Sequence, residues 1–179
     1  MGSVRAKRTS GPERLRFVVV TVSTSKYRRK SRNEEVDDES GDVAEAVARR
    51  SGHEVAQRIL VSDDPSMLIP RVENFLSGRN HAIFFVGGTG VSPDDLTIET
   101  IRPYIHKELE GFGELFRMLS YEKIGAPAIL TRALAGVARG KLIVCLPGSP
   151  DAVKTALEHF LPQFCDLFSV DGAQNPVIR

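Results

Sequence analysis

Short apolar runs alternate with amphipathic stretches along most of the chain. The apolar runs predict strands over 17–23, 55–61 and 82–86, and a hairpin with arms at 132–138 and 141–146. Continuously apolar strands are typical of parallel sheets that are covered on both faces. Helical patterns separate the strands at intervals of roughly 25–30 residues, which indicates βαβ units. The pattern therefore predicts an α/β fold with a mostly parallel sheet.

Capping residues and helical periodicity place helices between these strands. One helix is expected over about 42–50, ended by Gly52, and another directly after Asp64. A short helix is predicted to begin with Thr97 as its N-cap, and the last helix to run over 150–161. Because Asp64 directly precedes Pro65 at the start of a helix, we expect it to be a helix cap and not a catalytic residue.

Three polar segments predict interruptions of regular structure. Residues 27–39 join a cationic half to an acidic half, which predicts a mobile loop, although its cations could also hold a polyphosphate. Residues 110–114 contain two glycines and are expected to break the chain before an apolar helical stripe over 115–119. Residues 1–14 are predicted to form a disordered tail, which leaves a single domain at 15–179.

Composition and charge exclude several classes of protein. The 179 residues suit one domain, and 41% hydrophobic with 26% charged residues is ordinary for a soluble fold. The formal net charge of +1 gives no overall attraction to nucleic acid or to acidic membranes. No apolar run approaches the ~20 residues of a membrane span, and residues 1–16 lack the apolar core of a signal peptide. A cytoplasmic protein with neither nucleic acid nor membrane as a partner is expected.

The cysteines and histidines give no sign of a metal or thiol site. Cys145 lies within an apolar run and Cys165 near an apolar helical face, so both are interpreted as small core residues. The four histidines show no spacing typical of zinc ligands. Candidate chemistry must therefore come from other residues.

Two predicted strands end in loops that are suited to binding phosphate. The first loop reads Gly87-Gly88-Thr89-Gly90, and its glycines would let a ligand approach main-chain N–H groups. The second, over 146–150, places Ser149 as an N-cap and Pro150 at the first helical position, where free N–H groups attract anions. Neither loop matches the Walker or the dinucleotide fingerprint. Each could also be only a tight turn between a strand and a helix.

Pairs of acidic residues follow two of the strands. Asp63 and Asp64 come after the strand that ends at 61, and Asp94 and Asp95 come after the glycine loop. Mg²⁺ is commonly held by one or two carboxylates together with substrate phosphates, so these residues are candidate ligands. We favour Asp63 and Asp95 as functional residues, and Asp64 and Asp94 as structural ones. The alternative is that these acids serve only as N-caps of helices.

Six motifs occur in the order and spacing of the molybdenum cofactor biosynthesis family, and the chain most closely resembles its MoaB branch, related to MogA. The resemblance covers about residues 15–168. The motifs are Gly87–Gly90, Asp95-x-Thr97, EGFGE at 110–114, RMLS at 117–120, TRALAG at 131–136 and LPGSP at 146–150.

The resemblance implies a three-layer α/β/α fold that assembles as a homotrimer or hexamer. It also implies a Mg²⁺-dependent molybdopterin adenylyltransferase, in which the terminal phosphate of molybdopterin attacks the α-phosphorus of ATP and releases pyrophosphate. The adenylylated product would pass to a downstream molybdenum-insertion protein. The alternatives are a non-catalytic molybdopterin carrier or assembly scaffold, and a nucleotide-binding oligomer recruited elsewhere.

Particular residues take roles from this resemblance. Asp63 and Asp95 match the acids on which activity depends in related enzymes, and they would be the Mg²⁺ ligands. The substrate-binding residues would be Gly87, Gly88, Thr89, Gly90 and Ser120. The nucleotide-binding residues would be Pro147, Gly148 and Ser149. One departure is that the first strand runs into Val-Ser-Thr-Ser at 22–25, where many MogA members have an Asp-Arg pair.

Overall fold

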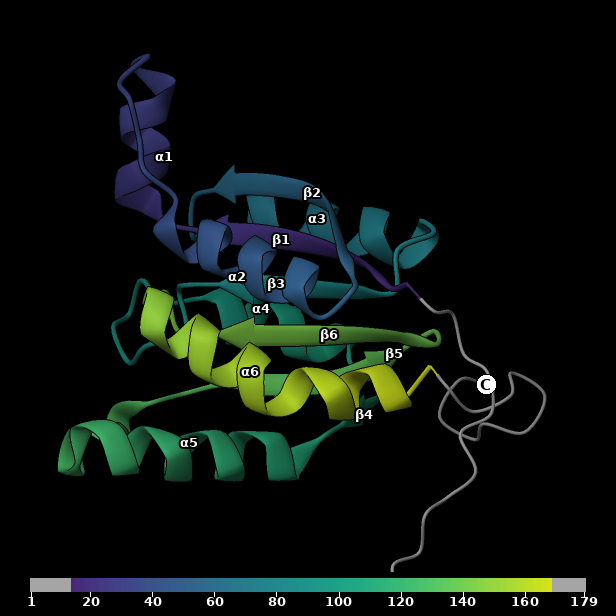
Figure 1. Cartoon of the computed structure of the whole chain (residues 1–179). Coiled ribbons are helices and arrows are strands. Elements are labelled where there is room, and N and C mark those ends of the chain that lie inside the picture. Colours follow the sequence, from purple (N-terminus) through teal and green to yellow (C-terminus); the bar gives the residue numbers. More distant parts are fainter. Residues whose placement is uncertain (1–13, 169–179) are drawn as a thin grey trace, which may run out of the picture.

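The computed structural model describes residues 14–168, which form a six-stranded sheet between two layers of helices (Figure 1). The strand order is β2-β1-β3-β6-β5-β4; the first four strands are parallel, and β5 and β4 are antiparallel to their neighbours. The strands are β1 (Arg16–Val22), β2 (Glu54–Val61), β3 (Ala82–Val86), β4 (Lys107–Glu108), β5 (Leu134–Ala138) and β6 (Lys141–Leu146). The predicted α/β class and hairpin are confirmed. Nearly all of the predicted 1–14 tail, and residues 169–179 of the predicted domain, lie outside the described residues.

The helices are distributed over both faces of the sheet (Figure 1). Helices α2, α5 and α6 cover one face, α3 and α4 cover the other, and α1 projects from the end of the sheet at which β1 terminates. The helices are α1 (Thr24–Ser31), α2 (Glu39–Arg50), α3 (Pro65–Ser77), α4 (Thr97–Ile101), α5 (Glu110–Ile124) and α6 (Pro150–Asp166), with 3₁₀ turns η1 (Arg102–Tyr104) and η2 (Ala126–Leu130).

Alternating side chains of the central strands build two separate cores. In β3, Phe84 and Val86 pack against α2, α5 and α6, whereas Ile83 and Phe85 pack against α3 and α4. Successive residues of a strand point to opposite faces, and both faces are covered, so the whole strand must be apolar. The central strands are thus held rigidly, and their carboxyl ends have fixed positions.

Both cysteines belong to the packed interior, as predicted. Cys145 is fully buried in one core, and burial raises the pKa of its thiol far above the ordinary value. Cys165 packs against the other core, with its Sγ 3.1 Å from His53 Nε2, and burial raises its thiol pKa to about 11. Neither thiol is activated as a nucleophile at neutral pH, because the reactive form is the thiolate.

Two predicted interruptions are wrong, the first of them in part. The polar sequence predicts a loop over 27–39, but residues 27–31 continue α1, which the Ser23 side chain caps by accepting from the Lys26 N–H. Residues 32–38 lie outside helices and strands, as predicted. This helix buries none of its residues, so it carries no apolar periodicity by which it could be recognised. Segment 110–114 does not break the chain but begins α5; at Gly113 an added Cβ would lie 3.2 Å from the Ala133 carbonyl oxygen. That glycine serves close packing, not a turn.

Several helix boundaries also differ from the prediction. Thr97 is the first residue of α4 and Leu96 occupies the N-cap, so the predicted capping role of Thr97 is wrong. Helix α2 begins at Glu39, three residues before the predicted start, because Asp38 caps it. Gly52 follows this helix with a φ of +83°, as its predicted role requires.

Candidate functional site

The two glycine-containing loops meet at the carboxyl ends of β1, β3 and β6. The Gly87 N–H donates to the Leu146 carbonyl at 2.9 Å, and Gly87 has a φ of +111°. An added Cβ at Gly87 would lie 2.1 Å from the Val22 carbonyl oxygen, and one at Gly148 would lie 3.3 Å from the Gly87 Cα. The backbones of the three strand ends therefore approach one another closely, and the two loops form one surface.

Asp63 lies against the first of these loops. Its Oδ2 accepts from the Leu96 N–H at 3.1 Å, and its Oδ1 accepts from the Thr97 hydroxyl at 3.2 Å, at the start of α4. An added Cβ at Gly88 would lie 2.1 Å from Asp63 Oδ2, so only glycine leaves room for the carboxylate. Burial raises the pKa of Asp63, and the nearby charges of Asp95 and Glu99 raise it further against the opposing hydrogen bonds.

The second candidate acid flanks the same loop. Asp95 Oδ2 accepts from the Ser92 N–H at 2.9 Å, and an added Cβ at Gly90 would lie 2.6 Å from that oxygen. The two candidate acids thus lie against two glycines of one loop. Asp64, in contrast, is exposed and caps α3 by accepting from the Ser66 N–H at 2.7 Å, which confirms its predicted structural role.

A small cavity joins the predicted molybdopterin-side residue to the second loop. The cavity has a volume of about 120 Å³. Ser120 of α5 lines it together with Pro147 and Ser149 of the loop that precedes α6. The Ser120 hydroxyl donates to the Phe116 carbonyl within α5 at 2.8 Å. The structure therefore places Ser120 beside the second loop.

Two cations near the site were missed by reasoning from the sequence. Lys123 lines the same cavity, where its Nζ donates to Asp151 Oδ1 at 2.9 Å and to Thr155 Oγ1 at 2.7 Å. Arg132 donates to the Gly90 carbonyl at 2.8 Å and forms an ion pair with Glu99. Neither lies in a phosphate-binding fingerprint, and only the tertiary fold brings each to its loop.

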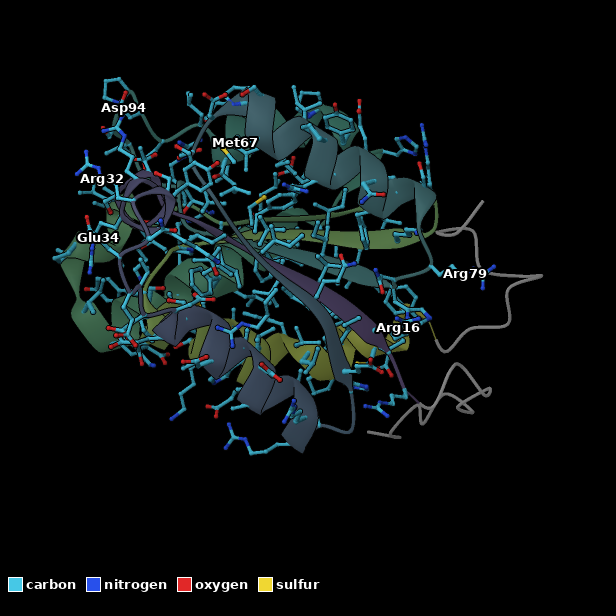
Figure 2. The ribbon with its side chains drawn as sticks, turned by 90° about the horizontal axis from the view of Figure 1, so that it is seen from above. Arg16, Arg32, Glu34, Met67, Arg79 and Asp94 are labelled. Carbon is cyan, nitrogen blue, oxygen red and sulfur yellow. The ribbon has the colours of Figure 1, made fainter. Side chains whose placement is uncertain are left out.

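Charged side chains lie at both ends of the sheet. Figure 2 shows Asp94, Arg32 and Glu34 at the end where this site lies, and Arg16 and Arg79 at the opposite end.

Within residues 14–168 no helix is long and apolar enough to cross a bilayer. In the same range no three His, Cys, Asp or Glu side chains are grouped so as to enclose a metal ion.

Comparisons with known proteins agree on one family. A family model described as "Probable molybdopterin binding domain" matches residues 18–165. A probable molybdopterin adenylyltransferase of Methanocaldococcus jannaschii is 38% identical over 145 residues, covering 80% of this chain and 86% of the relative. The molybdenum cofactor biosynthesis protein B of Bacillus subtilis is 38% identical over 161 residues, covering 89% and 91%.

A solved structure shows the same fold. The tungsten cofactor synthesizing protein MoaB from Pyrococcus furiosus superposes with a TM-score of 0.72 at 38% identity. The superposition covers 85% of this chain and 93% of that protein. The three-layer arrangement of helices around a mostly parallel sheet is therefore common to both chains.

Proposed function

The chain belongs to the molybdopterin-binding family of molybdenum cofactor biosynthesis, and we propose that it adenylylates molybdopterin with ATP. The observation that carries this proposal is the meeting of two loops at one sheet edge, with Asp63 against Gly88 and Gly148 against Gly87. Open α/β sheets bind ligands at the carboxyl ends of their strands. A site with two adjoining loops suits a reaction that joins two phosphate-bearing substrates.

The reaction requires positioning more than it requires a covalent nucleophile. An oxygen of the molybdopterin phosphate forms a bond to the α-phosphorus of ATP, and the bond to the departing pyrophosphate breaks. Negative charge on the phosphates would be stabilised by main-chain N–H groups at the start of α6. The ammonium of Lys123, which lines the cavity, would stabilise it further. The site contains these groups and no activated thiol.

We assign the residues to two sides of this site. Asp63 and Asp95 would be the acids on which turnover depends. Molybdopterin would contact the first loop, Gly87–Gly90, together with Ser120, which lines the cavity. The nucleotide would contact the second loop, at Pro147, Gly148 and Ser149. The two loops meet at Gly87 and Gly148, so substrates on the two sides would adjoin each other, with Ser120 beside the second loop.

Mg²⁺ fits the donors of this site as part of a complex with substrate. Two carboxylates, Asp63 and Asp95, flank the glycine loop, and Mg²⁺ needs only one or two carboxylates beside phosphate oxygens and water. When bound, the ion would neutralise charge on the reacting phosphates. The raised pKa of Asp63 is consistent with a carboxylate that gains from a nearby cation.

One observation favours the alternative of a non-catalytic molybdopterin carrier. The Asp63 carboxylate already accepts hydrogen bonds from Leu96 and Thr97, which would suffice for a structural role at the start of α4. A pyrophosphate-release assay separates the two functions. Release that requires both molybdopterin and ATP supports the transferase, whereas molybdopterin binding without release supports the carrier.

We propose that the chain forms a homotrimer or hexamer. Three large apolar residues of α5 and α6, Phe112, Phe116 and Phe164, belong to the core. Other large apolar side chains on α5 and η2 remain exposed. They are Leu115, Met118, Tyr121, Ile124, Ile129 and Leu130. Several of them line a hollow of about 430 Å³. An exposed apolar surface of this kind is typical of an interface.

Ile129→Glu is expected to shift the oligomer toward monomers. The Ile129 side chain is 83% exposed in the single chain, and a charge there would have to be desolvated at the interface. Light scattering at several concentrations measures the mass. Ala46→Glu on α2, another exposed position, is the control and should leave the mass unchanged. A wild-type protein that is monomeric throughout would contradict the proposed assembly.

The remaining proposals follow from membership of the family. Residues 15–179 would form one molybdopterin-binding domain, consistent with the family match over 18–165. The protein would act in the cytoplasm. Its adenylylated product would pass to a molybdenum-insertion protein.

A further inference from the structure

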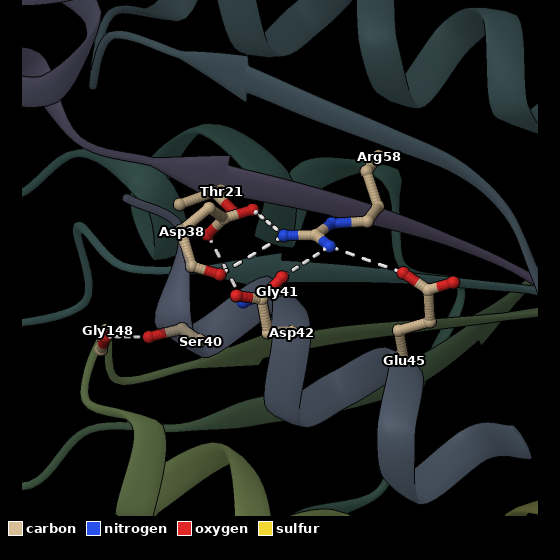
Figure 3. A network of polar contacts seen from close by, with 8 residues as sticks. All are labelled: Thr21, Asp38, Ser40, Gly41, Asp42, Glu45, Arg58 and Gly148. Carbon is tan, nitrogen blue, oxygen red and sulfur yellow. Dashed lines mark hydrogen bonds and ion pairs between the residues drawn. The ribbon is translucent and has the colours of Figure 1, made fainter. Parts of the chain in front are cut away.

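A polar network ties the start of α2 to neighbouring strands (Figure 3). Asp38 Oδ1 accepts from the Thr21 hydroxyl of β1 at 2.9 Å and from the Gly41 N–H at 3.1 Å. Asp38 Oδ2 accepts from Arg58 Nη2 of β2 at 2.7 Å. The carboxylate thus links the first turn of α2 to two strands, β1 and β2.

Arg58 extends this network along α2. Its Nη1 donates to Asp42 at 2.7 Å and to Glu45 at 3.2 Å, while its Nη2 also donates to the Asp38 carbonyl at 3.1 Å. An added Cβ at Gly41 would lie 2.1 Å from Asp38 Oδ2, so a side chain there would displace the carboxylate. Charge-assisted hydrogen bonds of this kind are stronger than neutral ones and fix orientation.

Ser40 connects this fixed helix start to the second loop. Ser40 is 3% exposed, and its hydroxyl donates to the Gly148 carbonyl at 2.6 Å (Figure 3). No peptide bond in the described chain is cis, and in a trans peptide the carbonyl and the following N–H point in opposite directions. A Gly148 carbonyl that is held toward α2 therefore turns the Ser149 N–H away from α2. Ser149 lines the cavity beside this loop.

We propose that Ser40 is a positioning residue for the nucleotide. By holding the Gly148 carbonyl, it orients the Gly148–Ser149 peptide so that the Ser149 N–H faces a phosphate of the ligand. The Ser149 hydroxyl oxygen caps α6 by accepting from the Ala152 N–H at 3.2 Å, so capping does not use the main-chain N–H of Ser149. This inference rests on the proposed nucleotide role of the second loop.

Ser40→Ala tests the proposal against a matched control. Ser77→Ala on α3 also removes a hydroxyl that donates to a carbonyl, that of Glu73 at 3.0 Å. Ser77 is the last residue of α3, two residues before Arg79, which lies at the end of the sheet opposite the site (Figure 2). Ser40→Ala is expected to raise KM for ATP about tenfold with kcat within about twofold, because the loop then binds nucleotide less well in both ground and transition states. Ser77→Ala should change neither constant.

Hydrogen–deuterium exchange of the peptide that spans 147–152 gives a second readout, which needs no activity. Exchange there should be faster in Ser40→Ala than in the wild type and in Ser77→Ala. An unchanged KM, or unchanged exchange, overturns the positioning role. A wild type that releases no pyrophosphate contradicts the proposed function instead, and the exchange comparison then still decides whether Ser40 orders this loop.

Discussion

Asp63→Asn is expected to lower kcat/KM for AMP transfer by about 10²–10³-fold, the loss typical of removing one electrostatic contact to the transition state. The asparagine keeps the size of the side chain and an oxygen that can accept from the Leu96 N–H, but it removes the negative charge. Activity would fall because the site then lacks a carboxylate that would hold Mg²⁺ beside the reacting phosphates. Steady-state kinetics with molybdopterin and ATP measure the change.

The same substitution should leave the fold at least as stable at neutral pH. Burial raises the pKa of Asp63, so the folded state disfavours its ionised form relative to the unfolded chain. Because the carboxyl pKa is higher in the folded state, this group's contribution to the free energy of unfolding falls as the pH rises above about 3.9, the pKa of an aspartate in the unfolded chain. Thermal unfolding should therefore show Asp63→Asn equal to or above the wild type at pH 7, with the gap closing near pH 3.

Asp64→Asn is the matched control for this prediction. Asp64 is the next residue, is exposed and caps α3, and asparagine is also a good cap. Its kinetic constants should match those of the wild type. Full activity in Asp63→Asn, or equal losses in both variants, would remove Asp63 from the catalytic account.

Gly87→Ala is expected to destabilise the fold by about 3 kcal/mol or more and to abolish binding at the first loop. The added Cβ would lie 2.1 Å from the Val22 carbonyl oxygen, and Gly87 has a φ of +111°, which alanine rarely adopts. The contacting atom is main chain of a central strand, so it cannot rotate away. Relief would require the loop to move, and the site would move with it.

Gly52→Ala separates the two causes of this loss. Gly52 also has a positive φ, of +83°, but an added Cβ there meets nothing within 4 Å. It should cost only about 1 kcal/mol, from the backbone strain alone. Urea denaturation of both variants gives the comparison. Similar costs at the two positions would mean that the close approach of β1 and β3 does not constrain the loop.

The central strands of the sheet could be predicted because each of them is a nearly continuous apolar run in the sequence. The run Ala82–Val86 is apolar at every position, and the structure shows why: its alternate side chains fill two different cores. The glycine loop could also be found, since three glycines within four residues after a strand indicate a backbone that needs positive φ or close approach. These signals depend on neighbours in the sequence.

The missed features depend on partners that are distant in the sequence. Helix α1 buries nothing, so its polar sequence matches that of a loop. The glycines at 110–114 suggest an interruption of the helix, but Gly113 instead leaves room for the Ala133 main chain, which packs against it. Lys123 and Arg132 become part of the site only through contacts with Asp151 and Gly90. No local pattern indicates such contacts.

The measurement that tests the account most directly is pyrophosphate release by the purified protein with molybdopterin, ATP and Mg²⁺. We expect one pyrophosphate for each AMP attached to molybdopterin, and no release when any one of the three is left out. Molybdopterin binding without pyrophosphate release would contradict the transferase and favour a carrier, and nucleotide binding without molybdopterin binding would contradict both.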